Sequence, residues 1–157
     1  LPDILTVAET RQVIARTRVL AYRVFFFVTY AMGLRLSETL QLQVGDIDAG
    51  HRRIHVRLGK GGKDRYVPLP DACLLALRRF WCTHRNPRLL FPNRRGGPKS
   101  VAAARSHMNT AGVQSALKAA VRECAISRHI TVHSLRHNAA SRIMLNRWER
   151  PGGALAA

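Results

Sequence analysis

The chain has 157 residues, of which 46% are hydrophobic, and this suffices for one globular domain with its own core. It contains 26 lysines and arginines against 9 aspartates and glutamates, which gives a formal net charge of +17. This excess argues against an enzyme of small neutral metabolites and favours a polyanionic partner: nucleic acid, an anionic membrane surface or a ribonucleoprotein assembly.

The basic residues are spread through segments of helical and strand-like pattern, so a folded basic surface explains them better than a disordered tail. Three cysteines without a C-x-x-C pair predict neither a disulfide framework nor a zinc ribbon, and they favour a reducing compartment. The longest apolar run, at 24–30, is too short to cross a bilayer, and the N-terminus lacks the order of a signal peptide. We therefore expect a soluble, cytoplasmic protein that does not cross a membrane.

Two helices are predicted near the N-terminus. Thr6, followed three residues later by Glu9, is a capping-box pattern that predicts a helix over about 7–16. The segment "VLAYRVFFFVTYAMG" is apolar nearly all round and ends at Gly33, which indicates a buried helix with a glycine C-cap. We expect this second helix to be the centre of the core.

The hydrophobic period changes in "VGDIDAGHRRIHVRLGKGGKDRYVPLP". Ile54, Val56 and Leu58 alternate with polar residues, and Tyr66 and Val67 follow a glycine-rich turn, which predicts a small antiparallel sheet with "GKGG" as a hairpin. Helical spacing returns in "DACLLALRRFWCTH", whereas "NPRLLFPNRRGGPKS" indicates an irregular basic loop. Two more helices are expected in "TAGVQSALKAAVRECAI" and "TVHSLRHNAASRIML". The predicted fold is mainly α with a small antiparallel β-sheet, in the α+β class.

Four polar residues from three separate segments form the combination that a phosphodiester site needs. Arg35 follows the buried helix, Lys60 lies in the predicted turn, and His133 and Arg136 are one helical turn apart. Two guanidinium groups can clamp the non-bridging phosphate oxygens and neutralise charge that grows in a pentacoordinate transition state. A lysine can protonate a leaving oxygen, and a histidine can move a proton or donate a hydrogen bond. Taken singly, each residue is better explained as an ordinary surface charge.

The same segments resemble those of the tyrosine recombinases, the phage-integrase family of site-specific DNA recombinases. "TYAMGLRLSETLQLQVGDID" resembles the family's first arginine motif, "GKGGKDRYVPLP" its lysine hairpin and "HSLRHNAASRIML" its His-x-x-Arg box, in the same order and spacing. The resemblance covers about 1–145 and implies a tyrosine-recombinase catalytic domain there, with 146–157 as an irregular tail outside the family pattern.

The resemblance implies a role for each residue of the combination. Arg35 and Arg136 bind the scissile phosphate in this interpretation, Lys60 is the general acid on the 5′-hydroxyl leaving group, and His133 assists proton transfer. Glu38 matches an acidic residue that supports the site. The resemblance also implies that neither a metal nor another cofactor is needed, because a tyrosine forms a 3′-phosphotyrosyl link that conserves the bond energy for religation.

Further basic residues in the hairpin and in the proline-containing loop are candidates for contact with the DNA backbone, with a solvated surface as the alternative. They are Arg57, Lys63, Arg65, Arg94, Arg95 and Lys99. Double-stranded DNA is the expected partner, full-length recombinase protomers are a second one, and neither a membrane nor a metal is expected. The resemblance implies a bacterial or phage protein associated with the nucleoid.

The sequence departs from the family pattern after the His-x-x-Arg helix. The family's Leu-Gly-His-type turn and nucleophilic tyrosine are not found there, and the tyrosines of the sequence are Tyr22, Tyr30 and Tyr66, all upstream of His133. We therefore expect a truncated chain without a nucleophile, which engages the scissile phosphate but does not cleave alone. Two functions stay open: a recombinase catalytic domain, or a non-catalytic accessory or inhibitory DNA-binding protein derived from an integrase.

Overall fold

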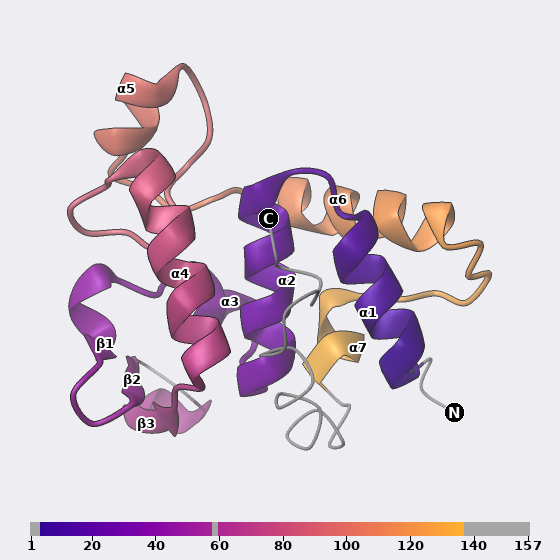
Figure 1. The fold of residues 1–157 in the computed structure, drawn as a ribbon, viewed down its shortest axis with the longest axis horizontal. Helices are drawn as coiled ribbons and strands as arrows, with labels where there is room; N and C mark the ends of the chain where they lie inside the picture. The colour runs from indigo at the N-terminus through magenta and orange to yellow at the C-terminus, as the bar shows by residue number, and fades with distance from the viewer. Residues whose placement is uncertain (1–3, 58–59, 137–157) are drawn as a thin grey trace.

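The structure is a computed structural model that describes residues 4–57 and 60–136, without the side chains of Lys60 and Arg136. Helices dominate this part of the chain, and a three-stranded antiparallel sheet lies at one side of them (Figure 1). The predicted fold class is thereby confirmed. The elements are α1 (Val7–Arg16), α2 (Leu20–Met32), α3 (Leu36–Leu40), η1 (Val44–Asp46), β1 (Ile47–Asp48), β2 (Arg53–Val56), η2 (Lys60–Gly62), β3 (Arg65–Pro68), α4 (Asp71–His84), α5 (Pro98–Ala102), α6 (Thr110–Glu123) and α7 (Val132–Arg136).

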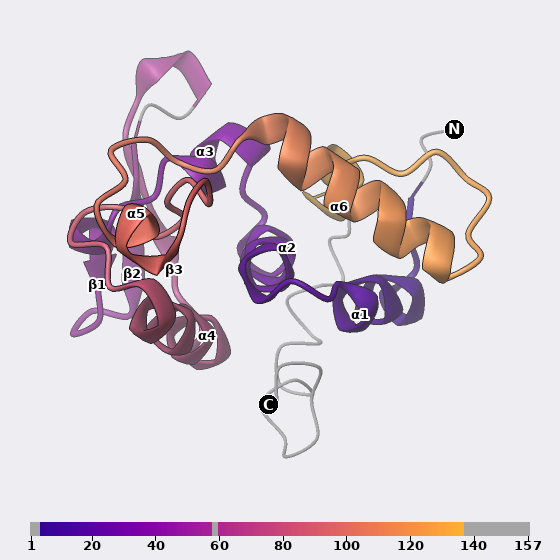
Figure 2. The ribbon, with the colours of Figure 1, turned by 90° about the horizontal axis from the view of Figure 1, so that it is seen from above.

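Helix α2 is the centre of the core, as its apolar sequence predicts. Ten of its thirteen residues are buried, and Phe25 and Phe26 are fully inaccessible. The helix runs between α1 on one side and α4 on the other, and both views show this order (Figures 1 and 2). It ends where Gly33 adopts a left-handed conformation with φ 66° and donates its N–H to the carbonyl of Thr29. This turn directs the chain into α3, which follows immediately.

The N-terminal capping box is present and helps to place the far end of the chain. The N–H of Glu9 donates to Thr6 Oγ1 at 3.1 Å, and the N–H of Thr6 donates to Glu9 Oε1 at 3.0 Å. The guanidinium of Arg128, in the segment between α6 and α7, also contacts Glu9 and donates to the carbonyl of Ile4. Helix α1 packs on α6, so these contacts fix the approach to α7 against the start of the chain.

The sheet has the strand order β1-β2-β3, and every pair is antiparallel. Ile54 pairs with Val67, and Val56 pairs with Arg65. Ile54 and Val56 are fully buried while Tyr66 is exposed, which is the alternation expected of a strand with one face on the core. The connection is not a tight two-residue hairpin, because it includes the short helical turn η2. Leu58, expected in the same alternation, lies outside the described residues.

The segment between α4 and α6 is more ordered than its prolines and glycines indicate. It contains the short helix α5, which begins with Pro98 at its first position, and isolated bridges join Gln43 to Leu89 and Pro92 to His107. Helices α6 and α7 are found where the sequence places them. The part of the last predicted helix beyond Arg136 and the tail 146–157 lie outside the described residues. No helix in the described ranges combines the length and the apolar composition that a bilayer crossing requires.

Candidate functional site

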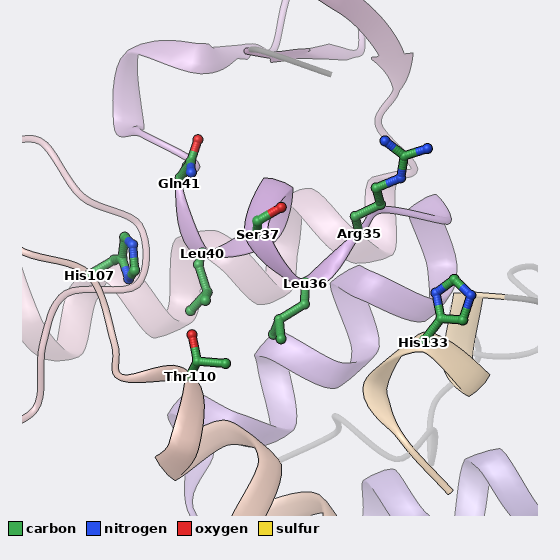
Figure 3. Close-up of a pocket in the computed structure, with 8 residues that line it drawn as sticks. All are labelled: Arg35, Leu36, Ser37, Leu40, Gln41, His107, Thr110 and His133. Carbon is green, nitrogen blue, oxygen red and sulfur yellow. The ribbon is translucent and has the colours of Figure 1, made fainter. Parts of the chain in front are cut away.

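A groove of about 510 Å³ lies where α3, the start of α6 and α7 approach one another. Its described lining residues are Arg35, Leu36, Ser37, Leu40, Gln41, His107, Thr110 and His133. Arg35 and His133 lie at one end, while His107, Thr110 and Gln41 lie toward the other (Figure 3). The fold therefore brings together two of the residues that the sequence singled out, one from the first arginine motif and one from the His-x-x-Arg box.

Arg35 is held through its backbone at the junction of α2 and α3. It is the N-cap of α3, in an extended conformation, and its N–H donates to Glu38 Oε1 at 2.8 Å. Its carbonyl accepts from the N–H of Thr39 at 3.0 Å and from the Thr39 hydroxyl at 3.2 Å. With both backbone groups engaged, the side chain projects away from the body of α3, on the side of the groove where His133 lies (Figure 3).

Glu38 is a buried carboxylate, 5% exposed, that joins two parts of the site. Besides accepting the Arg35 N–H, Glu38 binds the guanidinium of Arg65. Arg65 Nη2 donates to Glu38 Oε1 at 3.1 Å, and Arg65 Nη1 donates to Oε2. Burial acts to raise the pKa of Glu38, but the Arg65 guanidinium, the Arg35 N–H and the charges of both arginines outweigh it and hold this pKa below its ordinary value. Glu38 is thus a paired, ionised anchor beneath Arg35.

Helix α7 is amphipathic, and His133 lies on its exposed face. Val132 and Leu135 are buried, 3% and 1% exposed, and this helix packs on α2, whereas His133 is exposed. The first turn is closed because the N–H of Thr131 donates to Ser134 Oγ at 3.1 Å. Arg136, at the end of α7, follows His133 by one turn.

Lys60 begins η2, beyond the paired part of strands β2 and β3. The side chains of Lys60 and Arg136 lie outside the described part of the structure, so their roles stay predictions.

The basic residues expected to contact DNA fall into two groups. Arg57 and Arg65 are paired with carboxylates of the protein itself, the buried Asp46 and Glu38. Lys63, Arg95 and Lys99 are exposed, and the guanidinium of Arg94, also exposed, lies 5.0 Å from the centre of the Tyr22 ring. Their contact with DNA stays a prediction.

Sequence reasoning did not single out four polar residues of the groove: Ser37, Gln41, His107 and Thr110. His107 Nδ1 lies 2.7 Å from the carbonyl oxygen of Met108, so in the neutral ring this nitrogen carries the proton and Nε2 accepts. No periodicity marks these positions, because they meet only when α3 and the start of α6 pack together.

No tyrosine is among the described residues that line the groove. Tyr30 is 2% exposed within α2, Tyr22 is half-buried on the same helix, and Tyr66 is 57% exposed on β3 beneath the guanidinium of Arg53. The described residues also contain no cluster of three or more His, Cys, Asp or Glu side chains that could hold a metal ion.

Residues 1–150 match the sequence profile described as the phage integrase family. The chain belongs to the phage integrase family. Among integrase relatives, an integrase/recombinase of Escherichia coli is 31% identical over 156 residues, covering 78% of this chain and 46% of that protein. Tyrosine recombinase XerC of Halalkalibacterium halodurans is 33% identical over 135 residues, covering 79% of this chain and 41% of that protein. The integrase chain therefore spans less than half the length of these two relatives.

Solved structures of recombinases share the fold of this integrase chain. The crystal structure of XerA recombinase matches with a TM-score of 0.73 and 24% identity, covering 93% of this chain and 51% of that one. XerH site-specific recombinase, in a pre-cleavage complex with its difH substrate, matches with a TM-score of 0.67 and 22% identity, covering 94% and 44%. The resemblance noted in the three sequence motifs is thereby confirmed at the level of family and fold.

Proposed function

We propose that this chain is the catalytic region of a site-specific DNA recombinase, which binds duplex DNA and engages the scissile phosphate in the groove at Arg35 and His133. The observation that carries this proposal is the convergence of these two residues, from α3 and α7, on one groove in a phage-integrase chain. The net charge of +17 favours a polyanionic ligand. XerH, a protein of the same fold, is bound to a DNA substrate in its crystal structure.

The chemistry assigned to the site follows from what each group can do. A guanidinium is permanently charged and donates two parallel hydrogen bonds, so Arg35 suits the non-bridging phosphate oxygens. Its fixed backbone places this charge before DNA arrives, which lowers the reorganisation needed in the transition state. His133 is exposed and within one turn of Arg136, so the pair can grip the same phosphate while the histidine moves a proton.

The cleavage step requires two further groups. A tyrosine hydroxyl attacks phosphorus and passes its proton to His133, the bond to the 5′ oxygen breaks, and Lys60 donates the proton that this oxygen takes up. Since no tyrosine is among the described groove residues, we propose that the nucleophile comes from outside these 157 residues and that this chain alone binds without cleaving. The scheme needs no metal, because the guanidinium groups of Arg35 and Arg136 supply the positive charge at the phosphate. The phosphotyrosyl link conserves the bond energy for religation.

The proposal is tested by the salt dependence of duplex binding. We expect Arg35→Ala to weaken binding to a short DNA duplex and to lower the slope of log K against log salt by about 0.9, the value of one neutralised phosphate. Fluorescence anisotropy at several salt concentrations measures both. Arg79→Ala is the matched control, because it removes one exposed charge from α4, on the opposite side of the molecule from α3 (Figure 2).

We expect the control to keep the wild-type slope. Equal slopes for the wild type and Arg35→Ala would show that Arg35 does not bind the phosphate. A wild-type affinity that does not change with salt concentration would overturn the proposed function as a whole.

A non-catalytic DNA-binding role is the second candidate function, and the positions of the three tyrosines favour it. In this case the groove holds a backbone phosphate without chemistry, and the protein occupies sites or interferes with complete recombinases. Both functions predict the same salt slope, and both predict no covalent adduct from this chain alone. Covalent trapping separates them once a polypeptide that carries the missing tyrosine is added, because only the catalytic function then gives an adduct.

A further inference from the structure

Two arginines that flank the connection between β2 and β3 bind two buried carboxylates in the segment that carries Arg35. Arg65, the first residue of β3, binds both carboxylate oxygens of Glu38. Arg57, which directly follows β2, donates its Nε–H to Asp46 Oδ1 at 2.8 Å. Glu38 and Asp46 are 5% and 3% exposed. The hairpin is thus tied at both of its strands to the α3–η1 segment.

Each of these carboxylates also accepts a backbone N–H at the start of a helical turn. Glu38 Oε1 accepts from the N–H of Arg35 at 2.8 Å, and Asp46 Oδ2 accepts from the N–H of Gln43 at 2.9 Å. A continuous path of contacts therefore runs from the Arg65 guanidinium through the Glu38 carboxylate to the backbone of Arg35. Arg35 and the hairpin that carries Lys60 are therefore both attached to Glu38.

The charge of Glu38 makes Arg65 necessary to this arrangement. An unpaired carboxylate beneath Arg35 has two alternatives. It stays ionised, in which case it competes with a phosphate for the positive charge of Arg35, or it takes up a proton, in which case it becomes a weaker acceptor for the Arg35 N–H. The Arg65 guanidinium prevents both, because it neutralises Glu38 and occupies both of its oxygens.

We propose that Arg65 is a positioning residue for phosphate engagement: it holds Arg35 in the groove by way of Glu38 and ties the hairpin that carries Lys60 to the same point. This role rests on the proposed function. Arg57 and Asp46 form the second tie of the hairpin. In this role Arg65 acts through its ion pair with Glu38. A direct contact of its partly exposed guanidinium with the DNA backbone, as the sequence led us to expect, is the alternative that the experiment must separate.

The experiment is a double-mutant cycle on duplex affinity and its salt slope, with Arg65→Ala, Arg35→Ala and the double variant. If Arg65 acts through Arg35, Arg65→Ala lowers the slope by about 0.9, as Arg35→Ala does, and the double variant shows no further loss. If Arg65 neutralises a phosphate itself, the double variant loses about 0.9 more than Arg35→Ala. Additive losses would overturn the positioning role.

Arg65→Lys separates charge from geometry. It keeps the positive charge but cannot bind both oxygens of Glu38 in the planar fork of a guanidinium. We expect this variant to resemble Arg65→Ala in affinity and slope. A wild-type slope in Arg65→Lys would show that only the charge matters, and the positioning role would be wrong.

A second measurement reports on the anchor without DNA. In amide hydrogen exchange, the N–H of Arg35 and those of β3 should exchange faster in Arg65→Ala and Arg65→Lys than in the wild type, while the amides of α6 are unchanged. Unchanged exchange at Arg35 would overturn the proposal even in a chain that binds DNA. A wild-type chain whose DNA binding ignores salt would instead overturn the proposed function, whatever the exchange rates show.

Discussion

At the scale of single residues, Asn86 organises the whole connection between α4 and α6. It is 1% exposed, and its side chain makes four hydrogen bonds. Its Nδ2 donates to the carbonyls of Val101 and Ala104, and its Oδ1 accepts from the N–H groups of Arg88 and Leu89. The sequence shows only an asparagine before a proline, which is a common turn pattern. It does not indicate that this side chain binds four backbone groups of the connection.

We expect Asn86→Ala to lower the free energy of unfolding by about 2–4 kcal/mol, because four backbone groups around this buried side chain lose their partner. Urea denaturation followed by circular dichroism measures this change. Asn93→Ala is the matched control, since the Asn93 side chain accepts one bond, from the exposed Arg95 N–H, and should change the free energy by less than about 0.5 kcal/mol. Equal effects of the two substitutions would show that Asn86 does not support the connection.

At the scale of elements, the α2–α3 junction determines where Arg35 lies. The core helix ends at Gly33 in a left-handed conformation, and Arg35 is the N-cap of α3 two residues later. The sequence predicted this C-cap, and the structure confirms it. The sequence could not show that the following turn is locked by Glu38 and, through it, by a strand 27 residues further along the chain.

Gly33→Ala should destabilise the protein by about 1–2 kcal/mol, because an alanine in the left-handed region is strained. The added methyl group meets no atom within 4 Å, so the cost comes from the backbone and not from a clash. Gly45→Ala is the matched control: the added methyl is equally free there, and φ is not positive. Urea denaturation of both variants tests this, and a Gly33→Ala protein as stable as Gly45→Ala would contradict it.

At the scale of the whole molecule, the described groove is lined by Arg35 and His133, the residues proposed to engage the phosphate, but by none of the three tyrosines. Tyr22 and Tyr30 belong to the core helix, as their apolar surroundings predicted, and Tyr66 lies on the exposed face of the sheet. Packing decides this outcome, because a residue within a buried helix cannot turn toward the groove without unfolding the core.

We therefore expect no covalent protein–DNA adduct from this chain alone. Duplexes selected for binding from a random-sequence pool, nicked within the selected site and incubated with the protein, should give no adduct that survives denaturation. Tyr66→Phe is the informative variant, because Tyr66 is the exposed tyrosine. An adduct that the wild type forms and Tyr66→Phe does not form would show that Tyr66 is a nucleophile and that the proposed source of the tyrosine is wrong.

The sequence by itself determined the type and order of the longer helices and of the sheet, the buried helix with its glycine end, the hairpin and the motifs that carry Arg35, Lys60, His133 and Arg136. These features depend on the periodicity and turn chemistry of short segments, which local sequence records. Only the tertiary structure decided that Arg35 and His133 share a groove with His107 and that Arg57 and Arg65 are held by buried carboxylates. Those pairings join residues far apart in the chain, and they exist only because the helices and the sheet pack in one arrangement.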